Sequence, residues 1–300
     1  MIQMISAVLL FAFGPILLKM AMNEGIGPDQ VVVLRLAVAF PSFLAAVVVS
    51  RSLAASKPSF KEIPFLFFIS VFAMGGAMIC FVHSVMLLGA SVAALIGATQ
   101  PVMTALIAYF ALSRPVTSRQ ALSIAASFLG VFFIVIPMTG LLGLEKMLGV
   151  SPAGVGYSIL STVCAAAASL GFEKYVEGKK PLVASFQVTG MMLFFLAGAY
   201  GAPQLHFTTR IWTIAVMLGV VTWFLPFMLL FYGIREMGAS GASLVQNLGP
   251  VVTVLAAGVI FGERLAPAQM VGMTMVLSSV FILAWERKLA RQGALNMPEA

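Results

Sequence analysis

The sequence predicts an all-α integral membrane protein with ten transmembrane helices, arranged as two inverted five-helix repeats. Three observations lead to this fold class: a composition too apolar for a soluble fold, ten apolar runs of bilayer-spanning length, and identical residues that recur 149 positions apart, such as Pro101 and Pro250. We expect residues 1–140 to form the first repeat and residues 141–300 to form the second.

The composition requires a lipid environment, because 61% of the 300 residues are hydrophobic and only 9% are charged. Soluble domains carry about 25% charged residues. The 17 Lys and Arg residues outnumber the 10 Asp and Glu residues, but the basic residues fall in short loops between apolar runs. That placement indicates membrane orientation rather than a nucleic-acid partner. Cys80 and Cys164 lie inside apolar runs and predict no disulfide.

Ten runs are apolar over about the 20 residues that a spanning helix needs. In chain order they are Met4–Met22, Val31–Ser50, Ile63–Val85, Ser91–Leu112, Ser118–Pro137, Ala153–Tyr175, Leu182–Tyr200, Ile211–Ile234, Ser240–Phe261 and Pro267–Trp285. Pro58, Pro152, Pro181 and Pro267 stand at or just before helix starts, where a missing N–H does no harm. The third and fourth runs divide at Leu87–Gly89, because one unbroken helix would be far too long to span.

The distribution of basic residues orients these runs in the cytoplasmic membrane. With the N-terminus inside, the inside loops hold 12 of the Lys and Arg residues and the outside loops hold 3. Cytoplasmic loops carry the excess of Lys and Arg in membrane proteins. We therefore expect a multi-pass protein of the inner membrane with both termini in the cytoplasm and an even number of spans.

The two halves of the chain share an internal repeat. Gly89-Ala90-Ser91 matches Gly238-Ala239-Ser240, and Pro101 matches Pro250, at the same spacing of 149 residues. Each half has an odd number of predicted spans, so the second half enters the membrane from the opposite side. Inverted repeats provide many secondary transporters with two interchangeable conformations. An old duplication kept only for stability is the alternative.

Several segments carry a resemblance to a known family. They are Phe13-Gly14-Pro15 through Lys19, Val33-Leu34-Arg35-Leu36, Gly89-Ala90-Ser91 through Pro101, and Gly238-Ala239-Ser240 through Pro250 to Gly262-Glu263-Arg264-Leu265. The chain resembles the EamA-like family of the drug/metabolite transporter superfamily over nearly its whole length. Two departures stand out: Phe13-Gly14-Pro15 replaces the usual Trp-Gly-Ser, and Ser113-Arg114-Pro115 lacks the acid of its counterpart Gly262-Glu263-Arg264.

The resemblance implies a ten-helix carrier with a central cavity between the halves, whose substrates are varied metabolites, often amino acids or their relatives. We therefore expect a secondary transporter that moves a small molecule, more often outward, with no enzymatic activity and no cofactor. A non-transporting receptor or scaffold is the alternative from another class. Long soluble loops would favour it, but the longest outside loop, Met138–Pro152, has about 15 residues.

A second rival is an intramembrane serine protease, because Gly238–Gly241 matches the Gly-x-Ser-Gly string of such enzymes. A serine needs a neighbouring base to act as a nucleophile. Both histidines, His83 and His206, precede Ser240, and His83 is expected on the other side of the membrane. The string is better explained as a repeat feature that allows close helix packing.

Pro101 and Pro250 are expected near the middle of the fourth and ninth spans. A proline there removes a backbone hydrogen bond, and paired interruptions in two halves mark the midplane site of many transporters. The polar residues beside the two prolines are Thr99, Gln100, Gln246 and Asn247. These residues predict a substrate cavity lined by amides, with helix-to-helix hydrogen bonds as the structural alternative.

Lys19 and Arg35 are the charged residues predicted well inside spans, both toward the outer half. An intramembrane charge is a functional candidate by default. We expect Arg35 to bond the carbonyl groups of a neighbouring helix. Lys19 is a candidate for attracting an anionic group such as a substrate carboxylate, and snorkelling to the interface is the alternative for both.

Aromatic residues supply the remaining candidates for substrate contact, with packing or interfacial anchoring as the alternative. They are Phe81 and His83 on the third span, Tyr157 on the sixth, and Trp223 with Phe224 and Tyr232 on the eighth. No Asp or Glu is predicted at mid-membrane, where proton-driven carriers usually keep a carboxylate. This favours a substrate that runs down its own gradient, with proton coupling through His83 as the alternative.

Overall fold

The computed structural model describes residues 2–52, 57–112, 117–139, 151–176, 179–201, 208–229, 249–263 and 265–295. Within these ranges every regular element is a helix, and no strand occurs. The all-α fold class is therefore confirmed for the described part of the chain.

The described part of the first half contains ten helical elements, several of which are pieces of one spanning helix. They are α1 (Ile2–Ala12), α2 (Gly14–Asn23), α3 (Pro28–Val49), η2 (Phe60–Glu62), α4 (Ile63–Phe67), η3 (Phe68–Gly75), α5 (Gly76–Leu88), α6 (Ala90–Gly97), α7 (Gln100–Leu112) and α8 (Ser118–Thr139). The second half comprises α9 (Pro152–Val176), α10 (Pro181–Tyr200), α11 (Thr209–Val216), η5 (Met217–Phe224), α13 (Gly249–Phe261) and α14 (Pro267–Leu295).

Seven helical stretches in the described residues are long and apolar enough to cross a membrane. They are Ile5–Asn23, Pro28–Val49, Phe60–Leu88, Ala90–Ile107, Pro152–Phe172, Pro181–Tyr200 and Thr209–Leu229. These stretches correspond to the first four predicted runs and to the sixth, seventh and eighth. Helices α8, α13 and α14 fall on the other three runs, and the start of the ninth run lies outside the described residues.

Proline and glycine set the helix boundaries as the sequence predicts. Pro152, Pro181 and Pro267 are the first residues of α9, α10 and α14. At this position the backbone N–H that proline lacks would have no partner within the helix. Between α5 and α6, Gly89 has a φ of 83°, a left-handed conformation that favours glycine. This residue confirms the expected division between the third and fourth runs.

In two pairs of elements, the first residues lie 149 positions apart along the chain, which is the spacing of the internal repeat. The π-helical segments η3 and η5 begin at Phe68 and Met217, and 217 minus 68 is 149. Helices α8 and α14 begin at Ser118 and Pro267, and this difference is also 149. The repeat therefore extends from residue identity to backbone conformation, because π-helical turns are rare and here recur in register.

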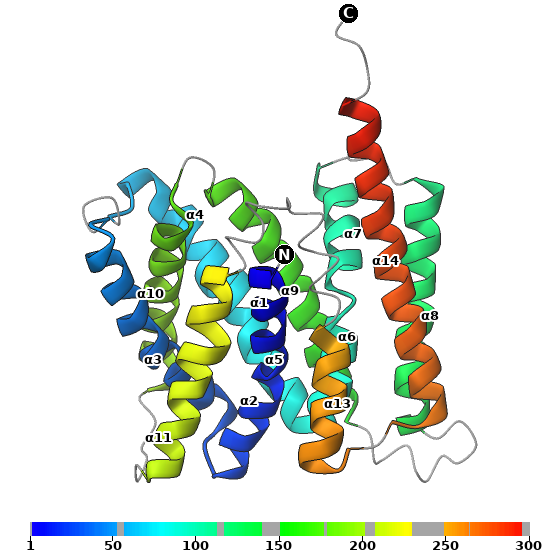
Figure 1. Ribbon diagram of the computed structural model, residues 1–300, viewed down its shortest axis with the longest axis horizontal. Coiled ribbons are helices and arrows are strands. Elements are labelled where there is room, and N and C mark those ends of the chain that lie inside the picture. Colours follow the sequence, from blue (N-terminus) through cyan, green and yellow to red (C-terminus); the bar gives the residue numbers. More distant parts are fainter. Residues whose placement is uncertain are drawn as a thin grey trace, which may run out of the picture.

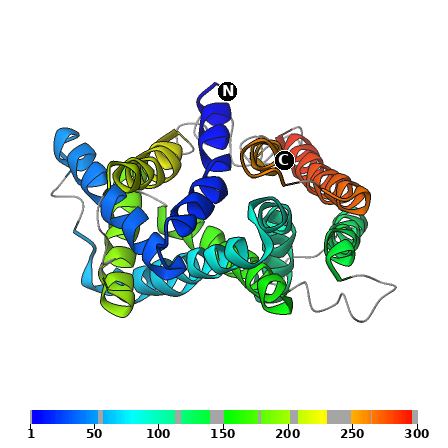
Figure 2. The ribbon, with the colours of Figure 1, turned by 90° about the horizontal axis from the view of Figure 1, so that it is seen from below.

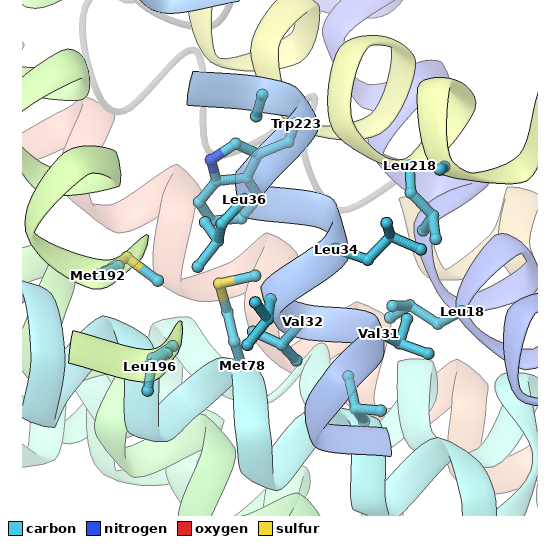
Figure 3. Close-up of a cluster of buried hydrophobic side chains, with 14 of the residues drawn as sticks. Leu18, Val31, Val32, Leu34, Leu36, Met78, Met192, Leu196, Leu218 and Trp223 are labelled. Carbon is cyan, nitrogen blue, oxygen red and sulfur yellow. The ribbon is translucent and has the colours of Figure 1, made fainter. Parts of the chain in front are cut away.

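The largest apolar cluster surrounds α3, which packs against α2, α5, α10 and η5 (Figure 3). On α3 itself, Val31, Val32, Leu34 and Leu36 are buried. Their partners include Leu18 of α2, Met78 of α5, Met192 and Leu196 of α10, and Leu218 and Trp223 of η5. This contact set joins elements of both halves of the chain.

Helices α8 and α14 lie side by side at one edge of the bundle (Figures 1 and 2). Helix α1 begins and α14 ends toward the upper side of Figure 1, whereas α2, α5 and α13 end toward the lower side. We call this lower side the Glu263 end, because Glu263 follows α13 there.

Candidate functional site

A carboxylate network joins three elements at the Glu263 end. Lys19 of α2 donates a hydrogen bond from Nζ to Oε1 of Glu263 over 2.6 Å. The backbone N–H groups of Ala90 and Ser91, at the start of α6, donate to the same carboxylate over 3.3 and 3.0 Å. The Ser91 hydroxyl donates to Oε2 as well. Glu263 thus caps the N-terminus of a helix in the first half while it pairs with a lysine of that half.

The local sequence explains how Glu263 reaches this position. Gly262 has a φ of 66° and follows the last residue of α13, so the chain turns sharply before the acid. At Gly89, an added Cβ atom would lie 3.0 Å from Oε1 of Glu263, which is tighter than ordinary contact. The Nζ atom of Lys19 also lies 4.5 Å from the ring centroid of Phe261, an attractive cation–π distance.

The electrostatics of Glu263 favour its ionised form. Partial burial alone raises the pKa of Glu263, but hydrogen bonds from Lys19 and Ser91 outweigh this and hold the pKa below its usual range. The side chains of Lys19 and Glu263 are 26% and 19% exposed, so water screens the pair only in part.

A second polar group at the same end contains two of the predicted aromatic residues. His83 of α5 lies with Nε2 3.0 Å from Oδ1 of Asp29, in the first turn of α3. The imidazole also stacks on Tyr157 of α9, with ring centroids 5.1 Å apart and an interplanar angle of 23°. The structure therefore brings His83 and Tyr157 together and adds Asp29 as a partner.

Arg35 lies in the interior, with 7% of its surface exposed. Its Nη2 atom donates to the carbonyl oxygen of Thr222 over 2.6 Å and to the Thr222 hydroxyl over 3.2 Å. The guanidinium carbon lies 4.6 Å from the ring centroid of Trp223, and the Trp223 indole N–H donates to Oγ1 of Thr189 over 3.5 Å. The expected structural role of Arg35 as a partner of a neighbouring carbonyl is confirmed.

The fourth span is interrupted beside Thr99, as Pro101 predicts, but the interruption is a break between two helices and not a kink within one. Helix α6 ends at Gly97 and α7 begins at Gln100, so Pro101 is the second residue of a new helix. The expectation of a proline within one continuous helix is wrong at Pro101, because the chain breaks before it and leaves no intrahelical bond to lose. Pro250 lies in the first described turn of α13.

Thr99 and Gln100 point to different surroundings. Thr99 is 3% exposed, donates to the Ile96 carbonyl and lines a cavity of about 30 Å³ between α6, α7, α8 and α9. Gln100 donates from Nε2 to Oγ of Ser169 over 2.9 Å, on α9. In this conformation the Gln100 amide bonds helix to helix.

The remaining candidates complete the set. Phe81 packs against two apolar clusters, and a Cβ atom added at Gly97 would lie 3.8 Å from the Cε2 atom of Phe81. Phe224 packs edge-on against Phe43. The described residues do not include Tyr232, Ser240, Gln246 and Asn247. Within the described ranges no group of three or more His, Cys, Asp or Glu residues is placed to hold a metal ion.

Sequence reasoning did not select Glu263, Ser91 or Asp29 as site residues. Glu263 stands in the Gly-Glu-Arg motif of the resemblance, but its partners are 244 and 172 residues away along the chain. Only the packing of α2, α6 and α13 brings them together. The weak signal available was an acid directly after the ninth apolar run, at the same predicted membrane face as Lys19.

Comparison with known proteins agrees with this architecture. The family model described as the EamA-like transporter family matches residues 1–136 and 152–285. "Uncharacterized transporter YyaM" of Bacillus subtilis (strain 168) is 25% identical over 211 residues, which cover 69% of this chain and 65% of that protein. "Protein PecM" of Dickeya dadantii (strain 3937) is 25% identical over 201 residues, 64% of each chain. The chain thus spans just under two thirds of each of these relatives.

A solved crystal structure matches the fold with a TM-score of 0.64 at 16% identity, covering 96% of this chain and 97% of the other. This likeness concerns the fold alone. The family model, by contrast, covers most of the chain in two consecutive matches. The chain belongs to the EamA-like transporter family and is a multi-pass membrane protein of that family.

Proposed function

We propose that the protein is a secondary carrier that exports a small metabolite, an amino acid or a related compound, across the cytoplasmic membrane by alternating access. The family assignment supports transport. The finer claims rest on the repeat, on the paired helix interruptions and on the distribution of charge.

The repeat of rare backbone conformation is the single observation that carries the mechanism. Two π-helical segments recur 149 residues apart, at Phe68–Gly75 and Met217–Phe224. Such segments disturb the regular backbone ladder and are frequent at functional sites. In the proposed topology five spans separate equivalent segments, so these segments face opposite sides of the membrane. An exchange of their conformations would open the carrier to each side in turn.

The proposed substrate chamber lies between the halves, near the interruptions at Pro101 and Pro250. Its proposed polar contacts are Thr99, Gln100, Gln246 and Asn247, and its proposed aromatic contacts are Phe81, His83, Tyr157 and Trp223. Lys19 is proposed to attract an anionic group of the substrate. The hydrogen bond between Gln100 and Ser169 would then be exchanged for a substrate contact during the cycle.

The orientation follows from the basic residues. Twelve Lys and Arg residues fall in the loops assigned to the cytoplasm and three in the outside loops. Under this assignment both termini are cytoplasmic, and the Glu263 end faces outward. The placement of the start of α1 and the end of α14 toward one side of the bundle supports an even number of crossings.

Efflux of labelled compounds tests the proposal directly. Cells that overproduce the protein would be loaded with labelled amino acids and related metabolites, and their efflux measured. We expect one class to leave faster than in cells without the protein, and the double variant Gln100→Ala/Asn247→Ala to abolish the difference. Thr274→Ala is the matched control, because this exposed hydroxyl bonds only within its own helix, to Met270. Equal efflux by the wild type and the double variant would remove the amides from the chamber.

A further inference from the structure

Apolar packing joins the two halves at the Glu263 end, in addition to the carboxylate. Ala90 and Ala93 of α6 and Ala257 of α13 are fully buried in one cluster with Val85 of α5. Small side chains let two helices approach closely in a membrane. The outer ends of the fourth and ninth spans therefore touch in the described structure.

Glu263 accepts hydrogen bonds across this contact between the two halves. It belongs to the second half, whereas each of its four hydrogen-bond donors belongs to the first: Lys19 Nζ, the Ala90 and Ser91 N–H groups and the Ser91 hydroxyl. Charge-assisted hydrogen bonds are stronger than neutral ones. To separate α13 from both α6 and α2, the protein must break all four hydrogen bonds or transfer them to water.

The equivalent position in the first half is different. A shift of 149 residues places Glu263 on Arg114, which has donors and no acceptor. At this position of the repeat, the second half therefore has a carboxylate and the first half has a cation. A carrier with unequal closing contacts has unequal populations of its two conformations.

We propose that Glu263 is the latch that holds the outer gate of the carrier shut, and that its release from Lys19 and the start of α6 is required for outward opening. This inference rests on the proposed alternating access. It adds a named gating residue and a resting state closed to the outside. When the latch opens, Lys19 becomes available to a substrate anion that leaves by the same route.

Thiol labelling at the buried contact tests the latch without any substrate. The reporter is Val85→Cys, 1% exposed in the same cluster as Ala257, in a background with Cys80→Ala and Cys164→Ala. A membrane-impermeant thiol reagent is applied from outside to intact cells. We expect slow labelling in the parent and labelling about tenfold faster or more in Glu263→Gln, since about 1.4 kcal/mol of lost closure is tenfold in population.

The matched control is Glu24→Gln. Glu24 also forms an ion pair at this end, with Arg210 over 3.0 Å, but Arg210 is 71% exposed. Such exposed pairs contribute little, so the labelling rate should stay at the parental value. Lys19→Met and Ser91→Ala each remove one donor and leave the carboxylate, and both should give intermediate rates. They serve as the test in place of Glu263→Gln if that variant does not fold.

An unchanged labelling rate in folded Glu263→Gln, or in both Lys19→Met and Ser91→Ala, would overturn the latch. The readout is independent of transport. Faster labelling without any labelled compound being exported would uphold the latch and count against the proposed carrier function, whereas export with unchanged labelling would do the reverse.

Discussion

Arg35 of α3 donates a hydrogen bond to the carbonyl oxygen of Thr222, inside the π-helical segment η5 of the other half. A π-helical turn widens the backbone ladder, and in lipid each polar backbone group needs a partner within the protein. The guanidinium supplies one and stacks on Trp223 as well. This contact links the second span to the eighth and fixes the irregular backbone at the boundary between the halves.

Replacement of Arg35 should therefore destabilise the fold. For Arg35→Met we expect a loss of about 1–3 kcal/mol, because the Thr222 carbonyl is left without this donor in a buried site. Arg35→Lys should recover only part of the loss, since an ammonium lacks the planar fork and the stacking surface. Thermal unfolding in detergent measures the effect, with the exposed Arg119→Gln as the control. Equal melting temperatures for Arg35→Met and the control would refute this role.

The close approach of α3 and η5 yields a second prediction. A Cβ atom at Gly219 would lie 2.6 Å from Cβ of Val38 and 2.9 Å from the backbone nitrogen of Ala39. Because backbone cannot yield as a flexible side chain does, Gly219→Ala should cost about 1–3 kcal/mol. Gly198→Ala, which meets nothing within 4 Å, should be neutral or slightly stabilising. The comparison of their melting temperatures checks the packing, and a Gly219→Ala variant as stable as Gly198→Ala would contradict it.

These contacts illustrate how far the sequence alone could predict the structure. The break at Gly89 and the proline-led starts of α9, α10 and α14 follow from local chemistry, so they were predictable. The partner class of Arg35 was also predictable, because a buried charge must find carbonyl groups. The identity of that partner was not.

Glu263 shows the limit most clearly. Its role depends on donors from α2 and α6 that lie far away along the chain, and only tertiary packing defines such a set. Pro101 shows a smaller limit. The sequence predicts an interruption, but whether the chain kinks or restarts depends on Ala98 and Thr99, which here lie between α6 and α7. The π-helical segments have no reliable local signal, and only the repeat reveals that they are paired.

Lys19→Met should abolish transport with little loss of folded protein. Lys19 is partly exposed and contacts Glu263 and Phe261, so its removal costs little packing, but it takes away the cation proposed for the substrate anion. Initial efflux rates and the yield of monodisperse protein measure the two quantities. The exposed Lys61→Met is the control. Unchanged transport in Lys19→Met would remove this residue from the site.

Closure at the Glu263 end should depend on pH in one direction. The pKa of Glu263 lies below its usual range in the closed structure, because Lys19 and Ser91 donate to it despite its partial burial. The open state, without these donors, has the ordinary pKa of a glutamate carboxyl. Ionised Glu263 therefore stabilises closure fully above that value, and the contribution is lost as pH falls through it toward the lowered pKa.

The Val85→Cys reporter measures this dependence as a ratio of labelling rates. We expect the rate in the presence of Glu263, divided by the rate in Glu263→Gln, to be constant from about pH 6 to 8 and to rise toward one in acid. The ratio cancels the ionisation of the reporter thiol. A ratio that does not change with acid would show that the carboxylate does not control closure.

The central claim is that two five-span units enter the membrane from opposite sides. Site-directed labelling from each face of sealed membrane vesicles measures it most directly, with single reporter sites near residue 1, near residue 300 and in the segment 140–150 between the halves. We predict that both chain ends label from the cytoplasmic face and that the segment between the halves labels from the outside. Chain ends on different faces, or an intervening segment on the same face as the ends, would contradict the account.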